Sequence, residues 1–241
     1  MRTIPLLILP FLTLMSCAPI DQTRTTAEAK SSEVAAAPAP TAVPEAIAQG
    51  LNAQQALARL MAGNKRFVSG QPMATHRDSP RRDEVAKGQH PLAIIVCCSD
   101  SRVPPEMVFD VGLGDIFVVR VAGNVLDPIA LGSIEYAAEH LHVPLVVVMG
   151  HERCGAVTAA LGKTAPPQHI LAIVEAIQHN IHGLTPDAKD PVDQAVRANA
   201  AAVAKQIADS EPLLKEMVTS GHLRVSAVRY DLDDGAVEGI Q

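Results

Sequence analysis

Three short apolar runs constrain the fold of this chain more than any other feature. They are rich in Val and Ile, are bounded by glycine, proline or polar residues, and occupy residues 92–96, 116–121 and 145–149. Runs of this length and composition are typical of strands that are buried on both faces, as in parallel sheets. We therefore expect these runs to form the centre of a sheet.

Helical segments alternate with the apolar runs. Residues 51–68 and several later stretches have apolar side chains at helical spacing or helix-favouring composition: 128–141, 154–161, 170–182 and 192–207. A last strand is predicted at 223–230, with a turn at Asp233-Asp234-Gly235. The alternation predicts an α/β fold with a mostly parallel central sheet flanked by helices, in which ligands bind at the carboxyl ends of the strands. The polar segment 69–90 is predicted to be a long loop or arm.

The first seventeen residues have the layout of an export signal. They contain one basic residue, Arg2, then an apolar run, and end in Leu14-Met15-Ser16-Cys17. The apolar run is too short to span a membrane. A cysteine at this place resembles the bacterial lipoprotein signal, which implies a lipid on Cys17 and a location on the periplasmic or cell-surface side; Ala18 favours the outer membrane. An ordinary cleaved signal peptide is the alternative.

The composition changes at about residue 50. Residues 18–50 are rich in Ala, Pro, Thr and Ser, which predicts a disordered tether, whereas residues 51–241 can form one domain. The formal net charge of −6 and the six aromatic residues (two Tyr, four Phe) argue against a nucleic-acid partner. A membrane is expected as a partner only through the lipid.

Residues that can bind a metal follow the first and third apolar runs. Cys98 and Asp100 come after the first run, and His151 and Cys154 come after the third. Because the carboxyl ends of parallel strands meet at one edge of a sheet, the two cysteines and the histidine can converge on one tetrahedral zinc ion. Asp100 could reach the metal or a water bound to it, and Arg102 is placed to hold the Asp100 carboxylate.

Two other interpretations of these cysteines remain open at this point. Outside the cytoplasm, neighbouring cysteines commonly form disulfides, here Cys98 with Cys97 or with Cys154. A closed, purely structural zinc site is the second alternative. Arg120, inside an apolar run, must find a partner, and we expect an ion pair at an interface.

The pattern Cys-x-Asp-x-Arg, followed some fifty residues later by His-x-x-Cys, resembles the signature of β-class carbonic anhydrases. The similarity extends over four segments: 99–106, 112–124, 132–141 and 150–157. The resemblance implies one zinc ion per subunit, held by Cys98, His151 and Cys154, with Asp100 and Arg102 as a catalytic dyad.

The same resemblance implies further features of the site and the assembly. It implies that four residues line the substrate pocket, some of them across a dimer interface: Gln89, Phe117, Tyr136 and Gly155. The protein is accordingly expected to be a homodimer or a higher homo-oligomer.

The expected reaction is the reversible hydration of carbon dioxide to bicarbonate and a proton. Zinc with three protein ligands lowers the pKa of its water to about 7, and the resulting hydroxide attacks carbon dioxide while the dyad orients it. In a closed state Asp100 would become a fourth ligand. A non-catalytic zinc-binding module, or a zinc hydrolase of the same fold acting on another heterocumulene such as carbon disulfide, are the alternatives.

Overall fold

The computed structural model describes residues 51–164, 166–185 and 189–240. The export signal, the lipidation at Cys17 and the tether, all predicted within residues 1–50, lie outside this part of the chain. Within it, no helix has both the length and the apolar character needed to cross a membrane.

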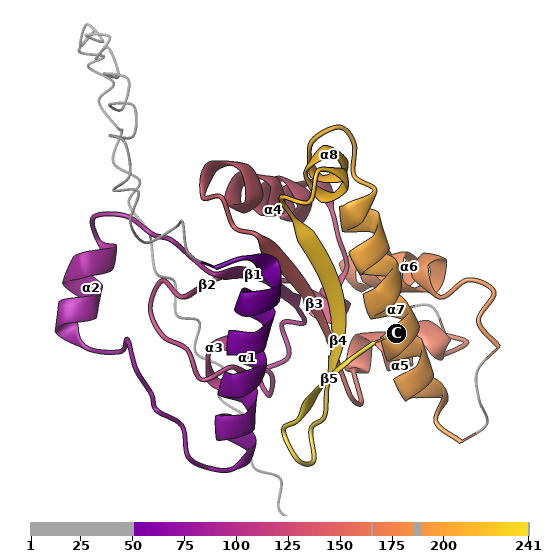
Figure 1. Cartoon of the computed structure of the whole chain (residues 1–241). Helices are drawn as coiled ribbons and strands as arrows, with labels where there is room; N and C mark the ends of the chain where they lie inside the picture. Colours follow the sequence, from indigo (N-terminus) through magenta and orange to yellow (C-terminus); the bar gives the residue numbers. More distant parts are fainter. Residues whose placement is uncertain (1–50, 165, 186–188, 241) are drawn as a thin grey trace, which may run out of the picture. The chain divides into compact units, whose positions relative to one another are not determined.

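Five strands of the described chain form a single sheet, in the order β2-β1-β3-β4-β5 (Figure 1). Four of them are parallel, and their bounds are β1 Ala93–Cys97, β2 Ile116–Arg120, β3 Leu145–His151 and β4 Arg224–Tyr230. The short β5, Val237–Gly239, runs antiparallel to β4 after the turn that contains Gly235. The predicted α/β fold with a mostly parallel sheet is confirmed, and β5 is an addition that the sequence did not predict.

Helices pack on both faces of this sheet (Figure 1). Their bounds are α1 Ala53–Val68, α2 Ser79–Val85, α3 Pro105–Val108, α4 Pro128–His140, α5 Gly155–Leu161, α6 His169–Asn180, α7 Pro191–Ala208 and α8 Leu213–Thr219. The segment 69–90, predicted to be a long loop or arm, contains the short helix α2, which the sequence did not predict. Asp78 caps α2 by accepting a hydrogen bond from the Arg81 backbone N–H, and Pro80 suits its first turn.

The side chains of β1 alternate between two buried clusters. Ile95 and Cys97 belong to the cluster that includes residues of α1, α5 and α6, whereas Ile94 and Val96 belong to the cluster under α4 and α8. Since both faces of the strand are covered, every residue of β1 is buried. This double burial explains why the strand is an uninterrupted apolar run in the sequence.

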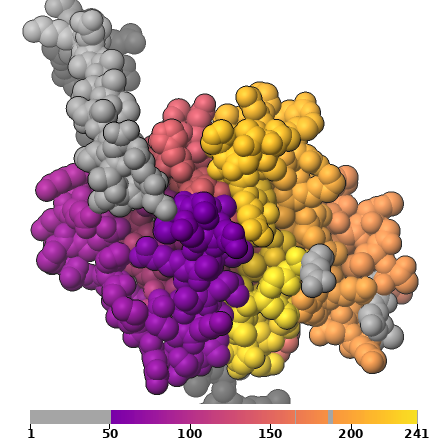
Figure 2. Space-filling model, in the orientation of Figure 1, coloured from indigo at the N-terminus to yellow at the C-terminus, as the bar shows by residue number. Residues whose placement is uncertain are grey.

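Helix α1 is anchored to the C-terminal strands by one buried asparagine. Asn64 Nδ2 donates to the carbonyl oxygens of Val108 (3.1 Å) and Gly235 (2.8 Å), and its Oδ1 accepts from the Val237 N–H at 2.9 Å. In Figure 2 the indigo surface of α1 adjoins the yellow surface of the C-terminal segment. The buried amide is thus fully satisfied, and it joins two segments that lie far apart in the sequence.

Candidate metal centre

The two cysteines and the histidine meet at the carboxyl ends of β1 and β3. Cys98 directly follows β1, His151 ends β3, and Cys154 immediately precedes α5. The two strands are parallel neighbours, paired from Ile94 opposite Val146 onwards, so the residues that follow them lie at one edge of the sheet. All three side chains are buried, and their ligand atoms lie within 4.8 Å of one another.

The imidazole of His151 has a free nitrogen that suits a metal. Its Nδ1 lies 2.8 Å from the backbone carbonyl oxygen of Glu152, which can only accept a hydrogen bond. Nδ1 therefore carries the proton, and Nε2 presents a lone pair. Nε2 is buried and has no hydrogen-bond partner in the described part of the chain. A buried, unpartnered Nε2 is explained if it binds a metal ion while the Glu152 carbonyl orients the ring through Nδ1.

The two thiols of the cluster differ in acidity. Hydrogen bonding, above all by Cys154 and also by the Gly123 N–H (3.2 Å from Sγ), outweighs burial and lowers the pKa of Cys98 to about 4. The pKa of Cys154 is raised by its hydrogen bond to Cys98 and by burial, so Cys98 ionises first. A thiolate of this kind is a metal ligand.

No disulfide joins the described cysteines. Cys97, Cys98 and Cys154 are all free in the structure, so neither proposed disulfide is formed. Cys97 is fully buried within β1, and burial is the main reason why its pKa rises to about 12. Cys97 is therefore a core residue, as the alternation of side chains along a strand predicts.

Asp100 and Arg102 form a two-point ion pair beside the cluster. Arg102 Nε donates to Asp100 Oδ1 at 2.9 Å, Nη2 donates to Oδ2 at 2.7 Å, and the Arg102 backbone N–H donates to Oδ1 at 3.0 Å. Hydrogen bonding by Arg102 is the main reason why the pKa of Asp100 lies well below its usual value. Asp100 Oδ2 lies 3.7 Å from His151 Nε2, so an ionised carboxylate faces the free nitrogen of the cluster.

Arg120 holds the loop that carries Cys98 and Asp100. Its Nε donates to the carbonyl oxygen of Cys98 at 3.0 Å, and its Nη2 donates to that of Asp100 at 2.6 Å. Within the described chain Arg120 thus bonds backbone carbonyls, and the ion pair at an interface stays a prediction. The register of the sheet explains the contact with the loop, because Arg120 pairs with Cys97, the last residue of β1.

The comparison with known families is consistent with this geometry. The family profile described as "Carbonic anhydrase" matches residues 93–237, which include every member of the cluster and both residues of the ion pair. This chain belongs to the carbonic anhydrase family. It is 41% identical over 180 residues to carbonic anhydrase 2 of Mycobacterium tuberculosis, an alignment that covers 73% of this chain and 87% of that protein. It is 38% identical, with the same coverage, to the carbonic anhydrase of Mycolicibacterium smegmatis.

Solved structures place the enzyme in the β class. The Coccomyxa β-carbonic anhydrase, solved in complex with acetazolamide, is similar with a TM-score of 0.61 and 26% identity, over 76% of this chain and 86% of that one. A β-carbonic anhydrase from Sordaria macrospora, one of two described as tetrameric, has a TM-score of 0.60 and 25% identity, over 76% of this chain and 96% of that one.

Of the four expected pocket residues of this carbonic anhydrase, the chain brings only Gly155 to the metal cluster. Gly155 begins α5 next to Cys154, and a Cβ atom built on it would meet no atom within 4 Å, so the position is open. Phe117 pairs in register with Ile94, three residues before the end of β2, and its ring lies 6.5 Å from that of Tyr136 between centroids. These two rings are therefore displaced from the carboxyl edge of the sheet.

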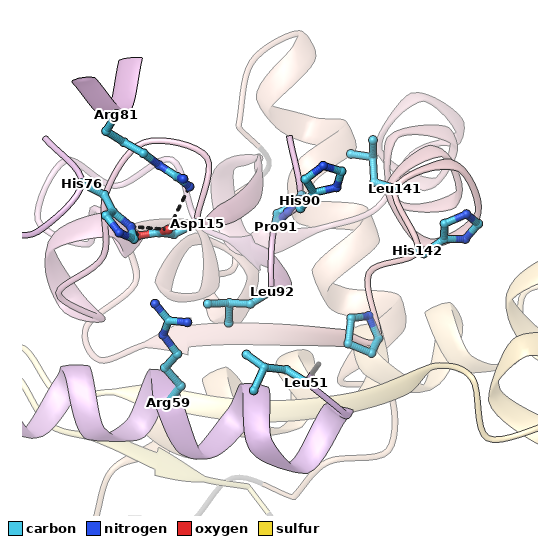
Figure 3. A pocket seen from close by; sticks show the side chains of 11 residues that line it. Leu51, Arg59, His76, Arg81, His90, Pro91, Leu92, Asp115, Leu141 and His142 are labelled. Carbon is cyan, nitrogen blue, oxygen red and sulfur yellow. Dashed lines mark hydrogen bonds and ion pairs between the residues drawn. The ribbon is translucent and has the colours of Figure 1, made fainter. Parts of the chain in front are cut away.

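Gln89 lies at the opposite, amino edge of the sheet. It precedes β1, next to a cavity of about 140 Å³ that is lined by residues just before the strands, among them His90, Asp115 and Pro144 (Figure 3). Asp115 accepts hydrogen bonds there from His76 Nδ1 (2.7 Å) and Arg81 Nη2 (3.3 Å). Because β1 separates this edge from Cys98, Gln89 cannot line the metal cluster of its own subunit.

Proposed function

We propose that this carbonic anhydrase is zinc-dependent and catalyses the reversible hydration of carbon dioxide to bicarbonate and a proton. One observation carries the proposal: Cys98, Cys154 and the free Nε2 of His151 converge beside the ionised carboxylate of Asp100. Membership of the family supports the reaction, and the donor set supports the metal.

The donors favour zinc over other divalent metals. Two thiolates and an imidazole suit zinc in tetrahedral coordination, whereas magnesium and calcium prefer oxygen ligands. Three protein ligands leave the fourth position open, as in catalytic zinc sites. When bound in such a site, zinc lowers the pKa of a water molecule to about 7 and so supplies a strong nucleophile at neutral pH.

Asp100 is placed to orient the nucleophile, and Arg102 holds Asp100 in position. The Asp100 carboxylate, which only accepts hydrogen bonds when ionised, is placed to accept one from the nucleophile and so to direct a lone pair at the substrate carbon. Arg102 keeps the carboxylate ionised and fixes its plane through two parallel hydrogen bonds. Release from Arg102 would free Asp100 to become a fourth metal ligand and close the site.

We also propose that the working enzyme is a homodimer or a higher homo-oligomer in which subunits share pocket residues. The position of Gln89, Phe117 and Tyr136 away from their own cluster supports a role at the cluster of a partner subunit. The tetrameric assembly of the similar Sordaria enzyme supports the oligomer. Gly155 would line the pocket of its own subunit.

For the location of the enzyme, the proposal depends on the sequence alone. We propose that residues 1–17 are a lipoprotein signal, that Cys17 is lipidated, and that a tether at 18–50 links the lipid to the domain at 51–241 outside the cytoplasm. Labelled palmitate should enter the full chain but not a Cys17→Ser variant, and only the unsubstituted chain should sediment with membranes. Equal labelling of the two chains would contradict the lipid anchor.

Stopped-flow hydration of carbon dioxide tests the activity. The zinc-loaded full chain should be fast, and Asp100→Asn should lose about 100-fold or more in kcat/KM because the orienting carboxylate is gone. Asp209→Asn is the matched control: Asp209 is also paired with a cation, Lys205, but on the surface at the end of α7, and its loss should leave the rate unchanged.

Two outcomes would contradict the proposal. Bound zinc without hydration of carbon dioxide at any pH up to about 9 would favour a non-catalytic zinc-binding protein. If that zinc-loaded chain, inactive on carbon dioxide, hydrolyses carbon disulfide, the result would instead favour the alternative heterocumulene substrate.

A further inference from the structure

The sulfur of Cys98 is linked to helix α7 by a chain of buried hydrogen bonds. The Gly123 N–H donates to Cys98 Sγ at 3.2 Å, and the Gly123 carbonyl oxygen accepts from Asn199 Nδ2 at 2.9 Å. Asn199 Oδ1 in turn accepts from Asn180 Nδ2 at 2.8 Å. Both polar atoms of the Asn199 amide thus have a partner, and its Nδ2 bonds Gly123, the residue that contacts the Cys98 sulfur.

Gly123 is held in its turn by one local and one long-range contact: the Asn124 N–H donates to the Val121 carbonyl oxygen at 2.8 Å, and Asn199 bonds the Gly123 carbonyl oxygen. Gly123 lies in the left-handed region at φ 68° and ψ 15°, within the 3₁₀ turn Ala122–Asn124. Glycine adopts many backbone conformations at similar energy, so its own sequence does not select this one. The bond from Asn199 fixes the direction of the Gly123 carbonyl and, with it, the turn whose N–H points at Cys98.

Asn199 is an unexpected residue at its place in the core. It is fully buried, with Val196, Ala200 and Val203 as buried apolar neighbours along α7. Burying an amide costs desolvation that its hydrogen bonds must offset, whereas an apolar side chain of similar size would pack there without that cost. The burial of an asparagine here is explained if its hydrogen bonds position the Gly123 turn beside Cys98.

We propose that Asn199 is a positioning residue for the metal centre. By holding the Gly123 carbonyl, it aims the Gly123 N–H at the sulfur of Cys98 and sets the orientation and donor strength of that ligand. This inference rests on the proposed zinc site, but not on turnover. Partners that orient a metal ligand in this way typically contribute a factor of about 10 to 100 to metal affinity.

The test compares zinc affinity in three variants of the full chain, by competition with a chelator. Asn199→Leu, which has the same branching at Cγ but is larger, removes both hydrogen bonds and should weaken zinc binding about 10- to 100-fold. Val203→Ala is the control: it lies one helical turn further along α7, is equally buried and makes no polar side-chain contact, so it loses stability without touching the chain of bonds. Its zinc affinity should match that of the unsubstituted protein. Asn180→Leu leaves the bond to Gly123 in place, removes the outer bond to Asn199 together with the one that Asn180 Oδ1 accepts from Gln206 Nε2, and should give a zinc affinity between those of the other two variants.

Cobalt substitution gives a readout that a merely structural role would not change. Loss of the N–H···S bond raises the energy of the sulfur lone pairs, so the thiolate-to-cobalt charge-transfer band should move to longer wavelength in Asn199→Leu and stay in place in Val203→Ala. Unchanged affinity and an unchanged band in Asn199→Leu would overturn the proposal.

The design still decides the question if Asn199→Leu does not fold. Asn180→Leu must then bind zinc more weakly than Val203→Ala, and equal affinities would overturn the proposal. Failure of the unsubstituted chain to bind zinc would refute the proposed metal site itself. If the chain binds zinc but does not hydrate carbon dioxide, weaker zinc binding in Asn199→Leu would still support the role of Asn199. Only the proposed reaction would then be refuted.

Discussion

The turn beside Cys98 is crowded at Gly123, where a side chain would force Ile177 to move, and this gives a quantitative prediction. A Cβ atom built there would lie 2.6 Å from Ile177 Cδ1 and 3.1 Å from the Cβ of Ala156. The left-handed backbone at φ 68° costs an L-residue about 1–2 kcal/mol, and overpacking of a filled core costs about 1–3 kcal/mol. Gly123→Ala should therefore lower the free energy of unfolding by about 2–5 kcal/mol.

The two contributions can be separated with a second substitution. Ile177→Val removes the Cδ1 atom that makes the closest contact, and alone it should cost about 0.5–1.5 kcal/mol. In the double variant the overpacking is relieved while the backbone cost remains. The double variant should therefore be more stable than the sum of the two single effects by about 1–3 kcal/mol.

Urea unfolding of the four proteins at one fixed protein concentration measures this coupling, since the stability of an oligomer depends on concentration. Additive effects would show that the strain does not arise at Ile177. A Gly123→Ala variant as stable as the unsubstituted protein would refute the left-handed geometry of the turn, and with it the way in which the Gly123 N–H reaches Cys98.

Three further predictions concern charged groups. Arg102→Lys should lower kcat/KM for hydration about 10-fold or more, because one ammonium cannot make the two parallel bonds to Asp100. It should leave the unfolding free energy nearly unchanged, because the Arg102 side chain is exposed. Arg120→Met should weaken zinc binding in a chelator competition, since two loop carbonyls lose their donor. Burial acts to raise the pKa of Asp110, but the hydrogen bonds from Arg66 and two backbone N–H groups outweigh it, so the folded pKa is depressed. Its stabilisation is present above the unfolded pKa of about 3.9 and is lost as pH falls further; acid titration of the zinc-free chain should be less steep in Asp110→Asn.

The strands and the cluster of Cys98, His151 and Cys154 could be predicted because both depend on local signals. A strand buried on both faces must be apolar throughout, so β1 and β3 are visible as Val- and Ile-rich runs. Cys98 and His151 are placed by covalent adjacency to the ends of those strands. Once the strands are parallel neighbours, their ends must meet, and no further tertiary information is required.

Elements without such a signal were missed. Helix α2 buries no residue, so it has no apolar period, and only its cap and proline mark it. Strand β5 has three residues, and its pairing partner β4 determines it. The role of Asn199 depends on its hydrogen bond to the Gly123 carbonyl, which is 76 residues away in the sequence. No sequence spacing predicts a contact over that separation.

The role of the expected pocket residues depends on contacts with a second subunit, which a single chain does not show. Phe117 lies on β2, which has β1 as its one neighbour in the described sheet, and Tyr136 is 48% exposed on α4 beside it. An apolar ring pair next to a free strand edge is costly to leave in water, and a second subunit that covered it would remove that cost. The same contact would bring an apolar wall from the partner subunit to the substrate pocket. Separating the subunits should therefore raise KM before it releases zinc, because the metal ligands all come from one chain.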